Sequence, residues 1–312
     1  MESFQKNNLS LASSAYLRMH SLNPIHWQIW STRVLSYAQE QNKLILVSIG
    51  YASCHWCHVM ANESFSDPEV AKVMNEHFIT IKVDREEQPD IDQLYCTAVQ
   101  LMTGSAGWPL NVVCLPDGRP IWGGMYFNKS DWLENLQAIL SLKETQPETL
   151  LAYASKLEQG IATSLLPSAN HAQTESIEQI VENWKDSMDF SYGGFRSNQK
   201  FLLANSLNFL VDYQSYYKES DTASFIDNTL QVALNRGLYD KVHGGFMRYC
   251  VDKKWRIPHF EKMLYDNALA LLLYSNAYAS NSNPKYKDAV YKTFHFLENN
   301  FYQEGSGYAA SQ

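Results

Sequence analysis

Lys43-Leu-Ile-Leu-Val-Ser-Ile-Gly50, followed at once by Tyr51-Ala-Ser-Cys54-His-Trp-Cys57-His58, is the stretch that decides the fold. Its first half is a short apolar run rich in β-branched residues, which favours a buried parallel strand. Its second half places two cysteines three residues apart at the start of a helix, on one helical face. A helix N-terminus stabilises a thiolate. The stretch therefore predicts a redox dithiol, with Cys54 as an exposed nucleophile and Cys57 as the resolving thiol.

Three other interpretations of the two cysteines stay open. The pattern C-x-x-C-H also marks haem attachment, but that chemistry belongs to exported proteins, and residues 1–16 contain no apolar signal segment. A zinc site built on Cys54, Cys57 and His58 would lack a fourth ligand, since no second C-x-x-C or H-x-x-H is present. The pair could also be ordinary buried cysteines, although a strand-to-helix corner is an unusual place for two. We therefore expect neither a metal nor a cofactor.

Length and composition predict two domains and limit the partners. The chain has 312 residues, of which 45% are hydrophobic, and this is ample for two packed cores. A net charge of -8 disfavours nucleic acid or an anionic membrane as the main partner. No apolar run reaches membrane-spanning length. Five scattered cysteines do not form a disulfide scaffold, so we expect a cytoplasmic location.

The segments that follow the dithiol complete an α/β order. We expect residues before Leu17 to be loose, a strand at Phe78–Val83 and a helix from residue 89 to residue 102. Leu110–Leu115 and Pro120–Phe127 then form a hairpin across a tight turn. This order matches the thioredoxin topology and places the dithiol at the carboxyl end of a central strand, where open sheets carry their sites.

The second half of the sequence is predicted to be all helical. A stretch rich in Pro, Ser, Ala, Asn and Gln at Pro167–Gln173 marks a linker. Five helices with apolar residues at three- and four-residue spacing follow: they are expected at Ser176–Met188, Phe201–Tyr217, Thr222–Tyr239, His259–Ala279 and Pro284–Asn300. Three glycine motifs each follow a helix: Tyr192-Gly-Gly-Phe195, His243-Gly-Gly-Phe246 and Gly305-Ser-Gly-Tyr308. The repeating unit is a helical hairpin with a glycine loop.

Three short motifs resemble a known family. Cys54-His-Trp-Cys-His-Val-Met60, Val83-Asp-Arg-Glu-Glu87 and Gly107-Trp-Pro109 are similar to the spermatogenesis-associated protein 20 family, also called the thioredoxin-like DsbH or YyaL group. The resemblance implies a thioredoxin-like domain over 1–166, with helical extensions at both ends. It implies that 174–312 is a helical domain similar to N-acylglucosamine 2-epimerases and six-hairpin glycosidases. Because five helices cannot close a toroid of about twelve, we expect a truncated, partial α/α toroid.

The resemblance also implies residues around the dithiol. Thioredoxin-like proteins place a proline, usually after a cis peptide bond, before the third core strand, and Pro109 occupies that place. His55, Trp56, Trp108 and Pro109 are therefore expected to line the substrate groove. Ordinary thioredoxins carry a buried acid six residues before the first cysteine, and here that residue is Ser48, which cannot titrate near neutrality. The histidines that flank the thiols either stabilise the thiolate or lie on a solvated helix face.

The densest polar cluster of the helical half is residues 255–266. His259, Lys262 and Asp266 are expected on one stripe of a helix, while Glu261 points about 140° away from Asp266. Paired-carboxylate glycoside hydrolysis within this helix is therefore not supported. These four residues are candidates for a pocket, and capping with ion pairing at the helix start is the alternative.

Together these patterns predict a thiol–disulfide oxidoreductase that acts on protein or small-molecule disulfides and thiols. Two alternatives from other classes remain. One is a non-redox binding protein in which the dithiol is vestigial, and the other is a carbohydrate-active enzyme of the epimerase or glycosidase kind. A sugar is accordingly a candidate ligand of the helical half, whereas nucleic acid and membrane are not expected as partners.

Overall fold

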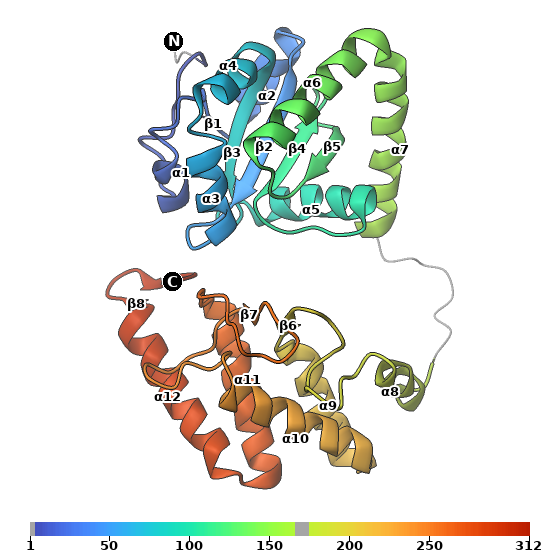
Figure 1. The fold of residues 1–312 in the computed structure, drawn as a ribbon, viewed down its shortest axis with the longest axis vertical. Coiled ribbons are helices and arrows are strands. Elements are labelled where there is room, and N and C mark those ends of the chain that lie inside the picture. Colours follow the sequence, from blue (N-terminus) through green and yellow to red (C-terminus); the bar gives the residue numbers. More distant parts are fainter. Residues whose placement is uncertain (1–3, 166–174) are drawn as a thin grey trace. The chain divides into compact units, whose positions relative to one another are not determined.

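The computed structural model describes residues 4–165 and 175–312. The chain divides into two compact units, residues 1–171 and 172–312, which Figure 1 colours blue to green and yellow to red. The first is called the sheet unit and the second the helical unit. The linker expected at Pro167–Gln173 lies wholly among the residues that are not described.

A mixed five-stranded sheet of order β1-β3-β2-β4-β5 forms the centre of the sheet unit. The strands are β1 (Gln28–Ile29), β2 (Leu44–Gly50), β3 (Phe78–Asp84), β4 (Leu110–Cys114) and β5 (Pro120–Gly124). β2 runs parallel to β3 and antiparallel to β4, and β4 and β5 form the predicted hairpin. Every residue of β2, β3 and β4 is buried, because helices cover both faces of the sheet (Figure 1). The predicted thioredoxin-like fold is confirmed.

Helices pack on the sheet according to the alternation of side chains along its strands. They are α1 (Ala15–Met19), α2 (Thr32–Glu40), α3 (His55–Glu63), α4 (Pro68–His77), α5 (Pro89–Thr103), α6 (Lys129–Thr145) and α7 (Pro147–Leu165). The odd-numbered positions of β2, such as Ile45 and Val47, share an apolar core with residues of α2 and α5. The even-numbered positions, including Ser48, face the opposite side, where Lys82 of β3 contacts Ser48.

The expectation of a loose N-terminal segment is wrong for residues 4–16. Leu9 and Tyr16 are buried, and α1 begins at Ala15. Ser14 caps this helix, since its Oγ accepts a hydrogen bond from the backbone N–H of Leu17 at 3.0 Å. The segment looks polar along the sequence because its apolar residues are few, yet Leu9, Ala12 and Tyr16 are all buried.

The helical unit contains the five predicted helices. They are α8 (Ile177–Lys185), α9 (Ala204–Tyr217), α10 (Ser220–Asn235), α11 (Leu264–Asn281) and α12 (Pro284–Asn300). Short strand pairs lie in the loops: β6 (Lys200–Phe201) with β7 (Tyr249–Cys250), and β8 (Tyr302–Gln303) with β9 (Gly307–Tyr308). One apolar core joins α8, α9, α10 and α11 and takes in the first part of α12. These helical hairpins with glycine loops agree with the predicted partial α/α toroid.

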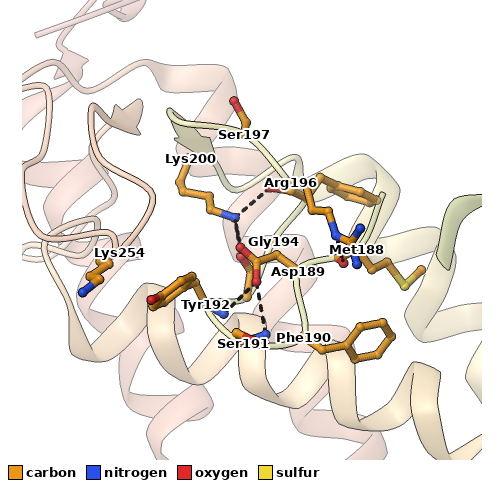
Figure 2. Close-up of polar contacts among 12 residues, drawn as sticks. Met188, Asp189, Phe190, Ser191, Tyr192, Gly194, Arg196, Ser197, Lys200 and Lys254 are labelled. Carbon is orange, nitrogen blue, oxygen red and sulfur yellow. Dashed lines mark hydrogen bonds and ion pairs between the residues drawn. The ribbon is translucent and has the colours of Figure 1, made fainter. Parts of the chain in front are cut away.

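A buried lysine closes the first glycine loop (Figure 2). The Asp189 carboxylate accepts hydrogen bonds from the backbone N–H groups of Ser191 and Tyr192. Lys200, whose side chain is 1% exposed, donates to Asp189 at 2.8 Å and to the carbonyl oxygens of Gly193 and Phe195 at 3.0 and 2.8 Å. The Lys200 amino group thus ties three points of one loop together through charge-assisted hydrogen bonds, which are stronger than those between neutral groups.

The second glycine loop repeats this arrangement. Asp240 accepts from the backbone N–H groups of Val242 and His243, and Lys262 donates to Asp240 at 2.8 Å and to the Gly244 carbonyl at 2.9 Å. Both glycines of this loop have positive φ, and a Cβ on Gly244 would lie 2.5 Å from a backbone oxygen of α12. Each loop is therefore an aspartate and lysine clamp around two glycines.

Candidate redox site

The predicted dithiol is present as a disulfide between Cys54 and Cys57, at the point where the chain leaves β2 and enters α3. Cys54 is the N-cap of α3, and its Sγ accepts a hydrogen bond from the backbone N–H of Cys57 at 3.2 Å. The expectation of an exposed Cys54 is wrong for this oxidised form, because Cys54 is only 3% exposed. The disulfide and the capping hydrogen bond hold its sulfur inward. A substrate must therefore first contact the side chains that surround the sulfur.

Two aromatic groups border the dithiol segment. Trp56 is 44% exposed, contacts His55 edge-on and lies 5.0 Å from the ring of Tyr126. Trp108 contacts Tyr51 edge-on across 6.0 Å. The residues predicted for the substrate groove are thus divided between the two groups. His55 and Trp56 lie in the first, and Trp108 lies in the second. Pro109 follows Trp108 through a cis peptide bond, as the sequence predicts.

An arginine orders the second aromatic group. The guanidinium of Arg85 lies 3.8 Å from the centroid of the Trp108 ring, and it pairs with Asp92 at 3.2 Å. The Trp108 indole N–H also donates to Asp92 at 2.7 Å. Burial raises the pKa of Asp92, although the bonds from Trp108 and Arg85 act in the opposite direction. Trp108 is therefore fixed on both its face and its edge.

The flanking histidines make different contacts. His58 Nε2 lies 2.8 Å from the carbonyl oxygen of Ala52, so its ring ties the helix to the loop before it. His55 packs edge-on against the exposed Trp56. Neither contact reaches a cysteine sulfur. His58 thus stabilises the loop that carries Cys54, and His55 belongs to the surface around the disulfide.

A buried polar cluster lies behind the dithiol, and the sequence interpretation missed it. Lys82 of β3 is fully buried, and its Nζ donates to Ser48 Oγ at 2.9 Å. Tyr16 of α1 is also buried against this face of the sheet. On the same strand, Asp84 accepts a hydrogen bond from Ser14 at 2.6 Å. A lysine in the middle of an otherwise apolar predicted strand was the only signal for this cluster in the sequence.

The three other cysteines are unsuited to redox chemistry at neutral pH. Burial raises the pKa of Cys96 to about 11, and it raises the pKa values of Cys114 and Cys250 to about 12. A thiol with so high a pKa is almost entirely protonated at pH 7, and the thiolate is the reactive form. These three thiols are thus held in the protonated, unreactive form at neutral pH.

The candidate residues of the helical unit do not form the predicted helical stripe. α11 begins at Leu264, so His259 and Lys262 precede the helix. The backbone there is engaged elsewhere: the N–H of His259 donates to Tyr249, and Lys262 exchanges two backbone hydrogen bonds with Gln312. The predicted helical stripe is therefore wrong. The backbone partners of this segment, Tyr249 and Gln312, are distant in sequence and hold the segment extended.

These four residues have separate surroundings. Lys262 belongs to the second loop clamp. Glu261 is 1% exposed and lies 3.3 Å from Arg248 and 3.8 Å from His259. Asp266 lines a cavity of about 450 Å³ between the starts of α9 and α11, together with Arg248. The structure thus brings Glu261 and His259 together and places Asp266 at a cavity, whereas Lys262 has a structural partner.

Among the described residues, no group of three or more His, Cys, Asp or Glu side chains is arranged to hold a metal ion. In the same residues, no helix has both the length and the hydropathy needed to cross a bilayer. The candidate redox site consists of a disulfide, an aromatic border and a buried polar cluster.

Comparison with known proteins supports the thioredoxin assignment. The family model Thioredox_DsbH, described as "Protein of unknown function, DUF255", matches residues 6–162. Human spermatogenesis-associated protein 20 is 33% identical over 98% of this chain and 41% of its own length. An uncharacterized protein of Caenorhabditis elegans is 34% identical over 99% of this chain and 44% of its own length. The chain thus spans about two fifths of the length of these relatives.

Solved structures resemble each unit only loosely. A DsbH oxidoreductase is 19% identical, with a TM-score of 0.30, over 37% of this chain and 85% of that one. A cellobiose 2-epimerase from Spirochaeta thermophila is 20% identical, with a TM-score of 0.40, over 43% of this chain and 36% of that one. By the family match over residues 6–162 and the similarity along nearly its whole length, this chain belongs to the thioredoxin-like DsbH family, which includes spermatogenesis-associated protein 20.

Proposed function

We propose that this protein is a thiol–disulfide oxidoreductase that uses Cys54 and Cys57. The observation that carries the proposal is the disulfide between them at the start of α3. A disulfide that spans a helix N-terminus exchanges with external thiols, because the helix dipole stabilises the thiolate released when it opens. The high pKa values of the three other cysteines leave this pair as the reactive one.

The reaction proceeds through a mixed disulfide. In the reduced protein, the Cys54 thiolate attacks one sulfur of a substrate disulfide, which releases one substrate thiolate and forms a bond between Cys54 and the other sulfur. The Cys57 thiol then loses its proton and attacks Cys54, which releases the second substrate thiolate. The substrate gains two electrons and two protons, and the protein dithiol is oxidised to the disulfide.

The aromatic border supports a polypeptide or another extended disulfide as the substrate. Trp56 and Tyr126 offer an exposed apolar face, and large aromatic side chains contribute much of the binding free energy at protein interfaces. Pro109 has no backbone N–H, so at this position a bound peptide can pair only with the carbonyl oxygen.

A redox titration tests this proposal. The intact protein is equilibrated in buffers of graded reduced and oxidised glutathione, quenched with an alkylating reagent and mapped by mass spectrometry. We expect one two-electron transition that involves only Cys54 and Cys57, while Cys96, Cys114 and Cys250 react as thiols throughout after denaturation. The proposal would be contradicted if Cys54 and Cys57 showed no transition in glutathione buffers or in dithiothreitol. A transition that pairs other cysteines would contradict it as well.

A second proposal concerns the helical unit, where one observation favours binding of a sugar. The cavity of about 450 Å³ is lined by the charged groups of Arg248 and Asp266 and by the aromatic side chains of Phe201 and Tyr265. A few polar groups among apolar ones are the usual lining of a small-ligand site. Sugars suit such a lining, because they present hydroxyl groups along their edges and C–H groups on their faces.

Titration calorimetry with a disaccharide such as cellobiose tests the second proposal. We expect saturable heat with the wild-type protein and at least a fivefold weaker affinity after Tyr265→Ala, since that ring lines the cavity. Tyr291→Ala is the matched control, because Tyr291 is similarly exposed and does not line the cavity. Equal affinities of the two variants, or no saturable heat, would remove the sugar proposal.

A further inference from the structure

The sheet face that Cys57 covers carries polar residues in adjacent positions. Ser48 and Gly50 of β2 pair in register with Lys82 and Asp84 of β3. Because side chains alternate along a strand, these four positions point to the same face of the sheet. Helix α1 covers this face with Tyr16, and every one of these residues is buried. A redox cysteine thus stands over a set of titratable groups from which water is excluded.

Gly50 brings the Tyr16 hydroxyl and the Cys57 sulfur together. A Cβ built on Gly50 would lie 2.4 Å from Tyr16 Oη and 2.7 Å from Cys57 Sγ. Both atoms therefore border the same small space, which exists because residue 50 has no side chain. Within the part of the chain that the structure describes, the buried Tyr16 hydroxyl has no hydrogen-bond partner in this oxidised form. A buried hydroxyl group costs free energy unless it finds an acceptor, and a thiolate at Cys57 is one.

Lys82 supplies a base in the same cluster. Its Nζ is bonded to Ser48, and the ion pairs found among the described residues do not include it. Burial lowers the pKa of Lys82 well below that of an exposed lysine, which favours the neutral amine. The ring centroids of Phe65, Trp27 and Tyr16 lie 4.5, 4.9 and 5.3 Å from Nζ. Aromatic faces stabilise an ammonium ion, so the amine can also hold a proton that it gains.

The other titratable groups near Lys82 are less suited to act as the base. His20, which follows α1, packs edge-on against Tyr16, and burial lowers the pKa of His20 well below its usual value. Burial and the charge of Asp84 raise the pKa of Tyr16, so the hydroxyl keeps its proton at neutral pH. Asp84 accepts hydrogen bonds from Ser14 and from the backbone N–H of Glu86. His58 is held by the carbonyl of Ala52.

We propose that Lys82 accepts the proton of the Cys57 thiol and that Tyr16 hydrogen-bonds the resulting thiolate. This inference rests on the proposed oxidoreductase function. In the step that resolves the mixed disulfide, the S–H bond of Cys57 breaks and its proton passes into the cluster to form the Lys82 ammonium. The Cys57 thiolate attacks Cys54, the bond between Cys54 and the substrate sulfur breaks, and the substrate leaves as a thiolate. Ser48 positions the Lys82 amine. This amine takes the proton of the second thiol, a role that a buried acid has in ordinary thioredoxins.

Stopped-flow reaction with dithiobis(nitrobenzoate) isolates this step. Attack by Cys54 releases a first coloured thionitrobenzoate, and attack by Cys57 on the mixed disulfide releases a second. In Lys82→Met we expect the first release to be unchanged and the second to be at least about 100-fold slower at pH 7, which is the lower end of the usual loss on removing a general base. The rate of the second release in Lys82→Met should rise about tenfold per pH unit from about pH 6 to about pH 9. Over the same range the wild-type rate should level off.

Two further variants keep the test decisive. Tyr16→Phe retains the ring and removes the hydroxyl, so we expect a slower second release without the change in pH profile. Thr80→Val is the matched control, because Thr80 lies on the same face of β3 and carries no titratable group. A Lys82→Met variant that matches Thr80→Val in rate and pH profile would overturn the Lys82 inference and leave the oxidoreductase proposal intact. A wild-type protein that never releases the second thiol would overturn both.

Discussion

Replacing Cys57 by serine is expected to stop turnover and to leave the substrate attached to Cys54. With the protein reduced beforehand, dithiothreitol then removed and insulin added as the disulfide substrate, we expect the rate of substrate release to fall by roughly a thousandfold or more, as on removal of an essential nucleophile. The reason is that the mixed disulfide at Cys54 then has no internal thiol to resolve it. Intact mass spectrometry should find one substrate chain bound through Cys54, and dithiothreitol should release it.

Two other cysteine variants complete this prediction. Cys54→Ser should lose as much activity and trap no substrate, because Cys54 is the N-cap of α3, where the helix dipole stabilises a thiolate, whereas Cys57 lies inside the helix. Cys96→Ser is the control and should retain activity within about twofold, since burial raises the pKa of the Cys96 thiol to about 11. A substrate adduct on any cysteine other than Cys54, or normal turnover by Cys57→Ser, would contradict the assigned order of the two thiols.

The parts of the sheet unit that the sequence predicts are those with local causes. The β2 run, the two cysteines and the hairpin after Pro109 depend on neighbouring residues, and their order limits the topology. Tyr16 and Lys82 have no such signal. Tyr16 is placed by packing against strands that follow much later in the chain, and Lys82 belongs to an apolar strand whose periodicity does not reveal a buried amine. The two-residue strand β1 likewise depends on a distant partner, since it pairs with β3.

The helical unit shows the same limit in a repeated form. The glycine motifs predict the loops, yet the lysines that close them escape a search for a fixed period. Lys200 lies 11 residues after Asp189, whereas Lys262 lies 22 residues after Asp240. Because the intervening chain differs in length, only the structure reveals that both clamps are alike. The wrong helical start at His259 has a related cause, since Lys262 and the residues beside it are held by distant backbone groups.

Lys200→Met is expected to reduce the free energy of unfolding of the helical unit by about 3–5 kcal/mol, which is typical of breaking a buried ion pair by removal of one partner. The change leaves the Asp189 carboxylate and the carbonyls of Gly193 and Phe195 without their buried donor (Figure 2). Hydrogen exchange measured by mass spectrometry separates this unit from the sheet unit. We expect faster exchange in α9 and α10, and no change in β2 and β3.

Acid dependence and a matched control make this last prediction specific. Burial acts to raise the pKa of Asp189, but the bonds from Lys200 and from backbone N–H groups outweigh it, so the folded pKa is lowered. Its contribution to stability is therefore present above the unfolded pKa and is lost as pH falls through the folded pKa. Lys200→Met should remove the share of this acid-sensitive stability that Lys200 supplies, whereas the backbone N–H groups of Ser191 and Tyr192 keep theirs. Lys254→Met changes an exposed lysine beside the same loop and should shift stability by no more than about 0.5 kcal/mol. If Lys200→Met were as stable as Lys254→Met, the clamp would be an ion pair without net stabilising effect, and the two glycine loops would be held by their backbone contacts alone.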